Sequence, residues 1–236
     1  MKAPSDTAPA LETPSFKERT RRIAHLALDP IASMLHRLHV GPDVMTVAGL
    51  LVSITAAIAF LFGRFRLGAV LMAIGGVCDV LDGELARRSG TRSRFGAFLD
   101  STLDRLSDGL VLTGIAGYYI IHLWALVLDP PAAVAEVTHG LEPIVWVNVA
   151  LTAVLALVGS FMVSYTRARA EGLGLECKVG WFERPERTVL LIVAASFGVG
   201  RWMSLGLMLL AGLSFITAAQ RVAHIWKQTR GAGVDS

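Results

Sequence analysis

The segment from Asp79 to Asp104 reads DVLDGELARRSGTRSRFGAFLDSTLD. It places four carboxylates, Asp79, Asp82, Asp100 and Asp104, within two otherwise apolar stretches. An ionised carboxylate near the hydrocarbon of a bilayer costs about 2.5–3.5 kcal/mol on insertion scales, so four of them need a compensating positive charge. Because the spacings are three and four residues, each pair lies on one face of a helix. A short turn at residues 88–94 would bring the two pairs together.

The composition around this segment is typical of a membrane protein. Of the 236 residues, 53% are hydrophobic and 17% are charged, whereas soluble domains keep about a quarter of their residues charged. These values exclude intrinsic disorder and a collagen-like fibre. Two cysteines are too few for the disulfide framework of a small secreted module.

Six apolar stretches are expected to cross the bilayer, since a spanning helix needs about 20 apolar residues. They are residues 44–63, 67–80, 95–128, 144–165, 188–200 and 203–224, and together they form a transmembrane domain at 41–228. Residues 1–14 are expected to be a disordered tail without the apolar core of a signal peptide, and 229–236 a C-terminal tail. Residues 15–40 predict an interfacial amphipathic helix, broken at Asp29-Pro30. The fold class is therefore an all-α, polytopic integral membrane protein.

The basic residues predict the orientation of the chain. They gather at residues 17–22, 87–94, 167–187 and 227–230, which six spans place on one side, whereas residues 129–143 contain no lysine or arginine. Basic loops remain on the cytoplasmic side of a membrane. We therefore expect a multi-pass protein of the cell membrane, with both termini and the carboxylates facing the cytoplasm.

The carboxylates indicate a metal site. Hard divalent cations such as Mg²⁺ or Mn²⁺ prefer carboxylate oxygens, and Mg²⁺ commonly binds through few carboxylates together with substrate phosphates. Gly83, Ala86 and Gly96 carry little or no side chain beside the aspartates, so a phosphate can approach the backbone closely. The segment thus predicts a site for a diphosphate bridged by metal.

The pattern Asp79-x-x-Asp82-Gly83-x-x-Ala86-Arg87, eight residues, Gly96, three residues, Asp100, three residues, Asp104 resembles the signature of the CDP-alcohol phosphotransferase family at every fixed position. The resemblance implies six transmembrane helices, an interfacial N-terminal helix and a homodimer. It also implies transfer of a phosphatidyl group from a CDP-lipid such as CDP-diacylglycerol to an alcohol, with release of CMP and use of two Mg²⁺ or Mn²⁺ ions.

The family's residue roles carry over to matching positions of this chain. By resemblance the four aspartates surround the metals, and Asp104 is also the general base. Asp108, one helical turn beyond, lies outside the signature and is expected to support the site. The implied CDP-lipid contacts are Asp43, Val44, Met45, Thr46, Gly83, Ala86, Arg87, Ser93 and Gly96. Many relatives carry asparagine at the position of Asp43.

A second polar cluster contains RARAEGLG at 167–174 and ERPER at 183–187. By themselves, its arginines are equally consistent with anchoring to lipid phosphates and with an anion pocket. The segments resemble those of actinobacterial phosphatidylinositol-phosphate synthases, which implies inositol phosphate as the acceptor. The implied phosphate-binding residues are Ser164, Arg167, Arg169, Arg184, Arg187 and Arg221. Arg167 stands where those enzymes commonly carry lysine.

Other functions are weighed against this one. Glycerol 3-phosphate or another alcohol is the alternative acceptor. A divalent-cation transporter is the alternative of a different class, and it would distribute carboxylates across the membrane depth, whereas here they lie toward one end of two helices. No nucleic-acid partner is expected.

Overall fold

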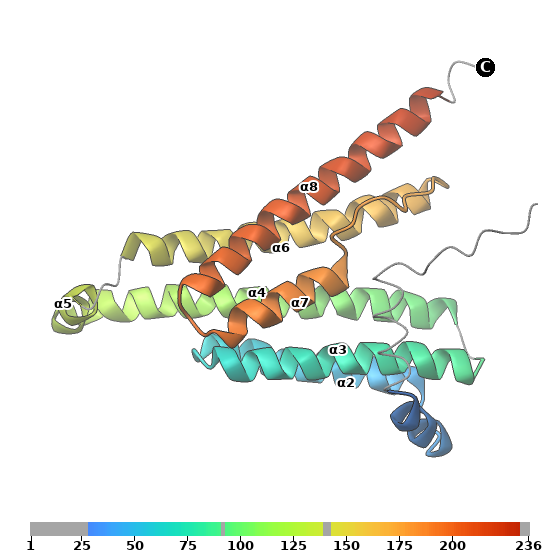
Figure 1. Cartoon of the computed structure of the whole chain (residues 1–236), viewed down its shortest axis with the longest axis horizontal. Helices are drawn as coiled ribbons and strands as arrows, with labels where there is room; N and C mark the ends of the chain where they lie inside the picture. The colour runs from blue at the N-terminus through green and yellow to red at the C-terminus, as the bar shows by residue number, and fades with distance from the viewer. Residues whose placement is uncertain (1–27, 91–92, 139–142, 232–236) are drawn as a thin grey trace, which may run out of the picture.

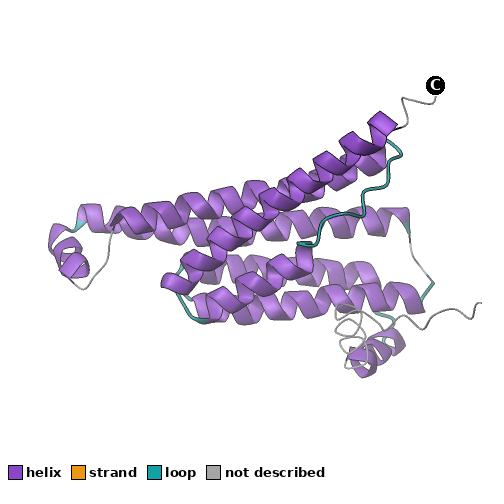
Figure 2. Ribbon diagram, turned by 45° about the horizontal axis from the view of Figure 1, so that its top comes forward, coloured by secondary structure: helices purple, strands orange, loops and turns teal. Residues whose placement is uncertain are grey.

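The computed structural model describes residues 28–90, 93–138 and 143–231. Within these ranges the chain forms helices joined by short loops and contains no strand (Figure 2), which confirms the all-α prediction. The predicted tail at 1–14, the first part of the predicted interfacial helix and residues 232–236 lie outside the described residues. Residues 28–37 are helical without a break at Asp29-Pro30, and the interfacial amphipathic helix expected at 15–40 stays a prediction.

Seven labelled helices follow in the order α2 (Pro42–Leu61), α3 (Phe65–Arg88), α4 (Arg94–Leu128), α5 (Pro130–Thr138), α6 (Pro143–Gly172), α7 (Arg184–Ser196) and α8 (Arg201–Gly231). The bounds of α4 agree closely with the prediction. The helices α6 and α8 extend past the predicted 165 and 224 because their apolar stretches continue into polar helical ends. A helix, α5, occupies the segment between the predicted third and fourth spans.

Four of the described helices, α2, α4, α6 and α8, are long and apolar enough to cross a membrane. The helix α3 has 24 residues, but the carboxylates of its second half interrupt its apolar stretch. The helix α7 has 13 residues and is about 20 Å long, less than the roughly 30 Å hydrocarbon core. Length and composition therefore support four of the six predicted spans among the described residues, and the other two stay a prediction.

The helices form an elongated bundle (Figure 1). The helix α2 packs against α3 and α4, and α6 packs against α4 and α8. The short α7 contacts α3 on one side and α8 on the other, so it joins the two halves of the bundle. Close packing of α2 and α4 depends on Gly114, where a Cβ atom would lie 2.3 Å from the carbonyl oxygen of Ala57.

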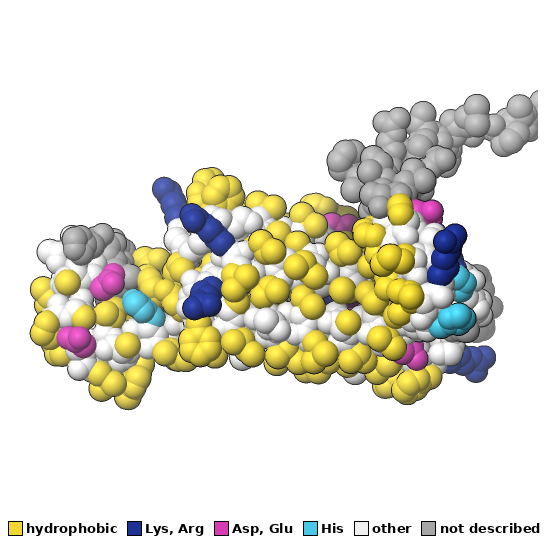
Figure 3. Space-filling model, turned by 90° about the horizontal axis from the view of Figure 1, so that it is seen from below, with side chains coloured by type: hydrophobic (Ala, Val, Ile, Leu, Met, Phe, Trp, Pro, Cys, Tyr) yellow, Lys and Arg dark blue, Asp and Glu magenta, His cyan; other side chains and the backbone are white. Residues whose placement is uncertain are grey.

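Hydrophobic side chains cover most of the bundle surface between its ends on the face shown in Figure 3, and the visible charged side chains lie mainly toward the two ends. Many large apolar residues are exposed on α2, α4, α6 and α8, among them Leu51, Ile120, Leu155 and Met208. Soluble monomers rarely expose contiguous apolar surface of this extent. The surface therefore suits contact with lipid chains.

Candidate active site

The polar end of the bundle contains the carboxylates singled out in the sequence. The last turns of α3 supply Asp79 and Asp82, and the antiparallel first turns of α4 supply Asp100 and Asp104. The two pairs lie close enough to interact electrostatically, and Asp108 interacts with Asp79 and Asp104. The packing of α2 against both α3 and α4, and of α7 against α3, thus brings five carboxylates near one another.

The positive charge among these carboxylates comes from α7. Nη1 of Arg184 pairs with Oδ2 of Asp79 and lies 2.9 Å from Oδ1 of Asp104. Nε of the same side chain lies 3.5 Å from Oδ1 of Asp108. The sequence placed Arg184 in an acceptor pocket but did not anticipate that it would also pair with the aspartates, because α7 follows Asp79 by more than a hundred residues.

The four predicted metal ligands are all carboxylates, and carboxylate oxygens are the ligands that a hard divalent cation prefers. As the side chains stand, however, no three His, Cys, Asp or Glu residues in the described part of the chain are grouped to hold a metal ion. Three of these carboxylates have other partners: Arg184 contacts both Asp79 and Asp104, and Thr46 donates to Asp82. The residues that would hold the metal are Asp79, Asp82, Asp100 and Asp104.

A pocket of about 330 Å³ opens beside Asp82 and Asp100. Its lining comprises Pro42, Asp43, Thr46, Asp82, Gly83, Ala86, Ser93, Gly96, Ala97 and Asp100. Six of the nine predicted CDP-lipid contacts therefore line one pocket: Asp43, Thr46, Gly83, Ala86, Ser93 and Gly96. At Gly83 an added Cβ atom would meet nothing within 4 Å, which leaves the backbone of α3 open to a ligand.

Three predicted CDP-lipid contacts do not line this pocket. Val44 is 60% exposed, and neither it nor Met45 belongs to the lining, because they lie on other faces of α2 than Asp43 and Thr46, which are three residues apart. Arg87 turns back along α3, where its Nη2 lies 2.5 Å from Oε2 of Glu84. Helical periodicity separates Val44 and Met45 from the cavity, whereas Arg87 shares the helix face of Gly83 and its side chain pairs with Glu84 instead.

Two hydrogen bonds shape this pocket. The buried hydroxyl of Thr46 donates to Oδ2 of Asp82 over 3.0 Å, which ties the start of α2 to the carboxylates of α3. The side chain of Ser93 accepts a 2.8 Å hydrogen bond from the backbone N–H of Gly96 and so caps the N-terminus of α4. Thr46 and Ser93 therefore have structural partners in addition to any ligand contact.

A second pocket, of about 180 Å³, borders Asp104. It is lined by Asp104, Arg105, Asp108, Val163, Ser164, Arg167, Glu183, Arg184, Pro185, Arg187 and Arg221. Five of the six predicted acceptor residues are in this lining. Arg169 is not: it is exposed, because two residues along α6 from Arg167 correspond to about 200° around the helix.

The charges of this second pocket favour an anion. Five arginines and three carboxylates line it, which leaves a formal excess of two positive charges. The N-terminus of α7, which begins at Arg184, adds the positive end of a helix dipole. The Arg187 side chain is 5% exposed, with Nη2 3.2 Å from Oδ2 of Asp108, and its Nε has no hydrogen-bond partner within the described residues.

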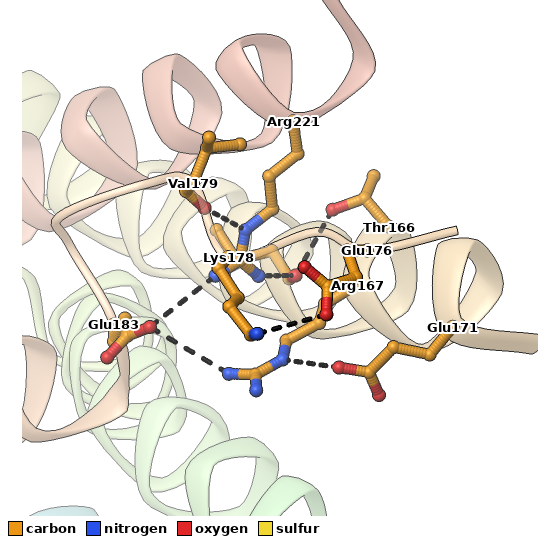
Figure 4. A network of polar contacts seen from close by, with 9 residues as sticks. Thr166, Arg167, Glu171, Glu176, Lys178, Val179, Glu183 and Arg221 are labelled. Carbon is orange, nitrogen blue, oxygen red and sulfur yellow. Dashed lines mark hydrogen bonds and ion pairs between the residues drawn. The ribbon is translucent and has the colours of Figure 1, made fainter. Parts of the chain in front are cut away.

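Arg221 and Arg167 approach the pocket from α8 and α6 (Figure 4). The Arg221 side chain is 3% exposed and donates from Nε to the carbonyl oxygen of Val179 over 2.9 Å. Oε1 of Glu183 lies 3.9 Å from Nη2 of Arg221 and 3.8 Å from Nη1 of Arg167. Glu183 was not predicted as a site residue, although its position at the N-cap of α7, directly before Arg184-Pro185, was a signal that it could face the same space.

Comparison with known proteins identifies the class to which this fold and site belong. The sequence model of CDP-alcohol phosphatidyltransferases matches residues 39–222. The chain therefore belongs to the CDP-alcohol phosphatidyltransferase family and is an enzyme of that class.

Several relatives are more specific. The chain is 37% identical over 219 residues to archaetidylinositol phosphate synthase of Methanothermobacter thermautotrophicus, a match that covers 92% of this chain and 97% of the relative. It is 35% identical over 204 residues to phosphatidylinositol phosphate synthase of Mycobacterium tuberculosis, covering 84% of each.

Solved structures agree with this likeness. The crystal structure of the M. tuberculosis phosphatidylinositol phosphate synthase with CDP-DAG bound superposes with a TM-score of 0.68 and 34% identity, over 87% of this chain and 94% of that one. The same enzyme in complex with manganese and citrate also gives a TM-score of 0.68, with 33% identity, over 84% of this chain and 88% of that one.

Proposed function

We propose that the chain transfers the phosphatidyl group of CDP-diacylglycerol to a hydroxyl of inositol phosphate, yielding phosphatidylinositol phosphate and CMP. The observation that carries the proposal is the position of Asp104. It belongs to the carboxylate cluster whose members Asp82 and Asp100 line one pocket, and it also lines the arginine-rich second pocket. An anionic alcohol in the second pocket would therefore present its hydroxyl beside the carboxylates. The family match favours an enzyme over the alternative of a cation transporter.

In the proposed reaction the aspartates act on the acceptor hydroxyl and on the diphosphate. The acceptor oxygen forms a bond to the phosphorus of the phosphatidyl group, the bond from that phosphorus to the bridging oxygen breaks, and CMP leaves. Asp104 takes the proton of the acceptor hydroxyl, which is a poor nucleophile without a base. Bound Mg²⁺ or Mn²⁺, as two ions held by the four aspartates, would neutralise the diphosphate and the departing CMP.

The remaining residues bind and orient the substrates. Asp43, Thr46, Gly83, Ala86, Ser93 and Gly96 surround the pocket proposed for the CDP moiety. Arg167, Arg187 and Arg221 are proposed to hold the phosphate of the acceptor, since guanidinium groups bind phosphate through paired hydrogen bonds. The buried state of Arg187 and Arg221 favours this role over lipid anchoring, which needs arginines that reach the membrane surface.

We further propose the membrane arrangement. The helices α3 and α7 cross with the four longer ones, residues 28–37 lie at the membrane surface, and the enzyme is a homodimer of the cell membrane with its active site and termini in the cytoplasm. The distribution of charge supports this orientation, because Arg87, Arg88, Arg167 and Arg187 cluster at the site end, whereas residues 129–143, between α4 and α6, have no basic residue.

The test is CMP release by purified protein given CDP-diacylglycerol, Mn²⁺ or Mg²⁺, and one acceptor at a time: inositol phosphate, glycerol 3-phosphate, inositol or serine. We expect inositol phosphate to be the best acceptor and free inositol to be poor. Equal use of inositol and inositol phosphate would contradict the phosphate pocket. A preference for glycerol 3-phosphate would reassign the acceptor, and a preference for the CDP-activated archaeal ether lipid over CDP-diacylglycerol would reassign the donor.

Arginine variants sharpen this test. Arg187→Ala and Arg221→Ala should each raise the acceptor KM about 10- to 150-fold, because a hydrogen bond to a charged group is worth about 1.5–3 kcal/mol. Arg169→Ala is the matched control, since Arg169 lies two residues from the pocket residue Arg167 on α6 but is itself outside the pocket. If Arg169→Ala raised the KM as much as Arg187→Ala, the effect would be one of overall charge.

A further inference from the structure

The guanidinium of Arg184 stands between two sites. It contacts Asp79, Asp104 and Asp108, and it also lines the pocket of about 180 Å³ proposed for the acceptor. Arg184 is the first residue of α7, so its side chain projects from a helix end, and a change of side-chain torsions alone can move the guanidinium between the aspartates and the pocket.

The contacts of Arg184 conflict with metal binding by the same aspartates. Its Nη1 lies at hydrogen-bond distance from Asp104 and pairs with Asp79, so it takes the place between the two carboxylates that a bridging cation would need. A divalent ion and a guanidinium in that place would also repel each other. Binding of the ion therefore requires the guanidinium to leave, and the neighbouring pocket is where it has room.

We propose that Arg184 is an exchangeable counter-cation: it neutralises Asp79 and Asp104 before metal binds, and the metal displaces it into the acceptor pocket, where it joins Arg187 and Arg221 in holding the phosphate. The metal half of this inference is independent of the acceptor, whereas the phosphate half rests on the proposed function. Arg184 is thus a positioning residue through which metal loading completes the acceptor site.

The exchange predicts a reciprocal coupling. If metal frees Arg184 for the phosphate, bound Mn²⁺ tightens the binding of a phosphate monoester, and the phosphate monoester tightens the binding of Mn²⁺ by the same factor. Without Arg184 the part of this coupling that the exchange supplies disappears. Removing Arg184 also removes the competitor of the metal, so Mn²⁺ alone should bind more tightly.

The first measurement is Mn²⁺ binding to the purified full chain without substrates, followed by the electron paramagnetic resonance signal of free Mn²⁺. Arg184→Ala should bind Mn²⁺ about 10- to 150-fold more tightly than the unmutated protein, the range expected for loss of a competing charged hydrogen bond. Arg187→Ala is the control, because Arg187 pairs with Asp108 but with none of the four predicted ligands. An equal gain in Mn²⁺ affinity in both variants, or no gain in Arg184→Ala, would overturn the proposed exchange.

The second measurement is calorimetric binding of inositol phosphate and of glycerol 3-phosphate, each with and without Mn²⁺. In the unmutated protein Mn²⁺ should lower the Kd of the phosphate monoester. In Arg184→Ala the ratio of the Kd without Mn²⁺ to the Kd with Mn²⁺ should be smaller by about tenfold or more. Coupling of undiminished size in Arg184→Ala would overturn the proposal, since the metal would then act on the phosphate directly.

Two outcomes separate this inference from the proposed function. If only glycerol 3-phosphate binds but the coupling depends on Arg184, the exchange stands and the acceptor assignment fails. If neither monoester binds but Arg184→Ala still gains Mn²⁺ affinity beyond the control, the metal half stands alone. If Arg184→Ala does not fold, Arg184→Lys takes its place. Lysine keeps the charge but lacks the planar guanidinium that contacts two carboxylates at once, so this variant should show a smaller gain in Mn²⁺ affinity. No gain in Mn²⁺ affinity would count against the exchange.

Discussion

Replacing Thr46 by valine tests whether the start of α2 acts on the reaction through Asp82. Valine keeps the shape of threonine and removes the hydroxyl, which is buried and donates to Oδ2 of Asp82 over 3.0 Å. The same hydroxyl lies 3.2 Å from the carbonyl oxygen of Pro42, but this oxygen is at the start of α2 and can accept the intrahelical N–H bond without the hydroxyl. The substantial loss is therefore at Asp82.

The size of the effect follows from that contact. A hydrogen bond to a charged group contributes about 1.5–3 kcal/mol, so its loss from a carboxylate proposed to hold metal corresponds to about a 10- to 150-fold lower kcat. Because the hydroxyl proton already has a partner in Asp82, the KM for CDP-diacylglycerol should change less than kcat. Thr46→Ser retains a hydroxyl and should recover most of the rate.

The assay is CMP release at varied CDP-diacylglycerol, with Mn²⁺ affinity measured alongside. Thr55→Val is the matched control, since Thr55 lies on the same helix and its hydroxyl donates only to the backbone of Leu51 over 2.9 Å. A normal kcat in Thr46→Val, or a rise in the CDP-diacylglycerol KM with kcat unchanged, would refute the reasoning and make Thr46 a direct ligand contact instead.

Other predictions concern the metal, the packing and the topology. Asp79→Asn should abolish CMP release while the protein still inserts and purifies as a folded species, and near-normal turnover would contradict the metal site. Gly114→Ala should lower the free energy of unfolding in detergent by about 1–3 kcal/mol, because the added methyl overpacks the contact of α4 with α2. Gly76→Ala is the control, since an added Cβ there meets nothing within 4 Å. Equal losses of stability in the two variants would show that the contact is not the cause. A cysteine introduced within residues 129–143 should react with a membrane-impermeant reagent added outside cells, and a cysteine introduced within 172–176 should not. The opposite pattern of labelling would reverse the proposed orientation.

The sequence was sufficient to predict the helical framework of this protein. In lipid every backbone polar group needs an internal partner, so apolar stretches of the length of α4 have little choice but to be helical. The spacing of Asp79, Asp82, Asp100 and Asp104 likewise assigns each pair to one helix face, because that relation depends only on the periodicity of the helix. The family signature adds the chemistry, since all its fixed positions lie in the one segment from Asp79 to Asp104.

Which side chains meet across the helices was decided by the tertiary structure. Thr46 reaches Asp82 and Arg184 reaches Asp79 across 36 and 105 positions of sequence, and no local pattern encodes either contact. Arg167 and Arg169 are equivalent as sequence, yet the rotation of α6 places only Arg167 in the pocket. A positive charge among the aspartates was required by electrostatics, but the packing of α7 between α3 and α8 is what brings a guanidinium to that place, because the position of a side chain across a bundle depends on how the helices pack and not on the residues beside it.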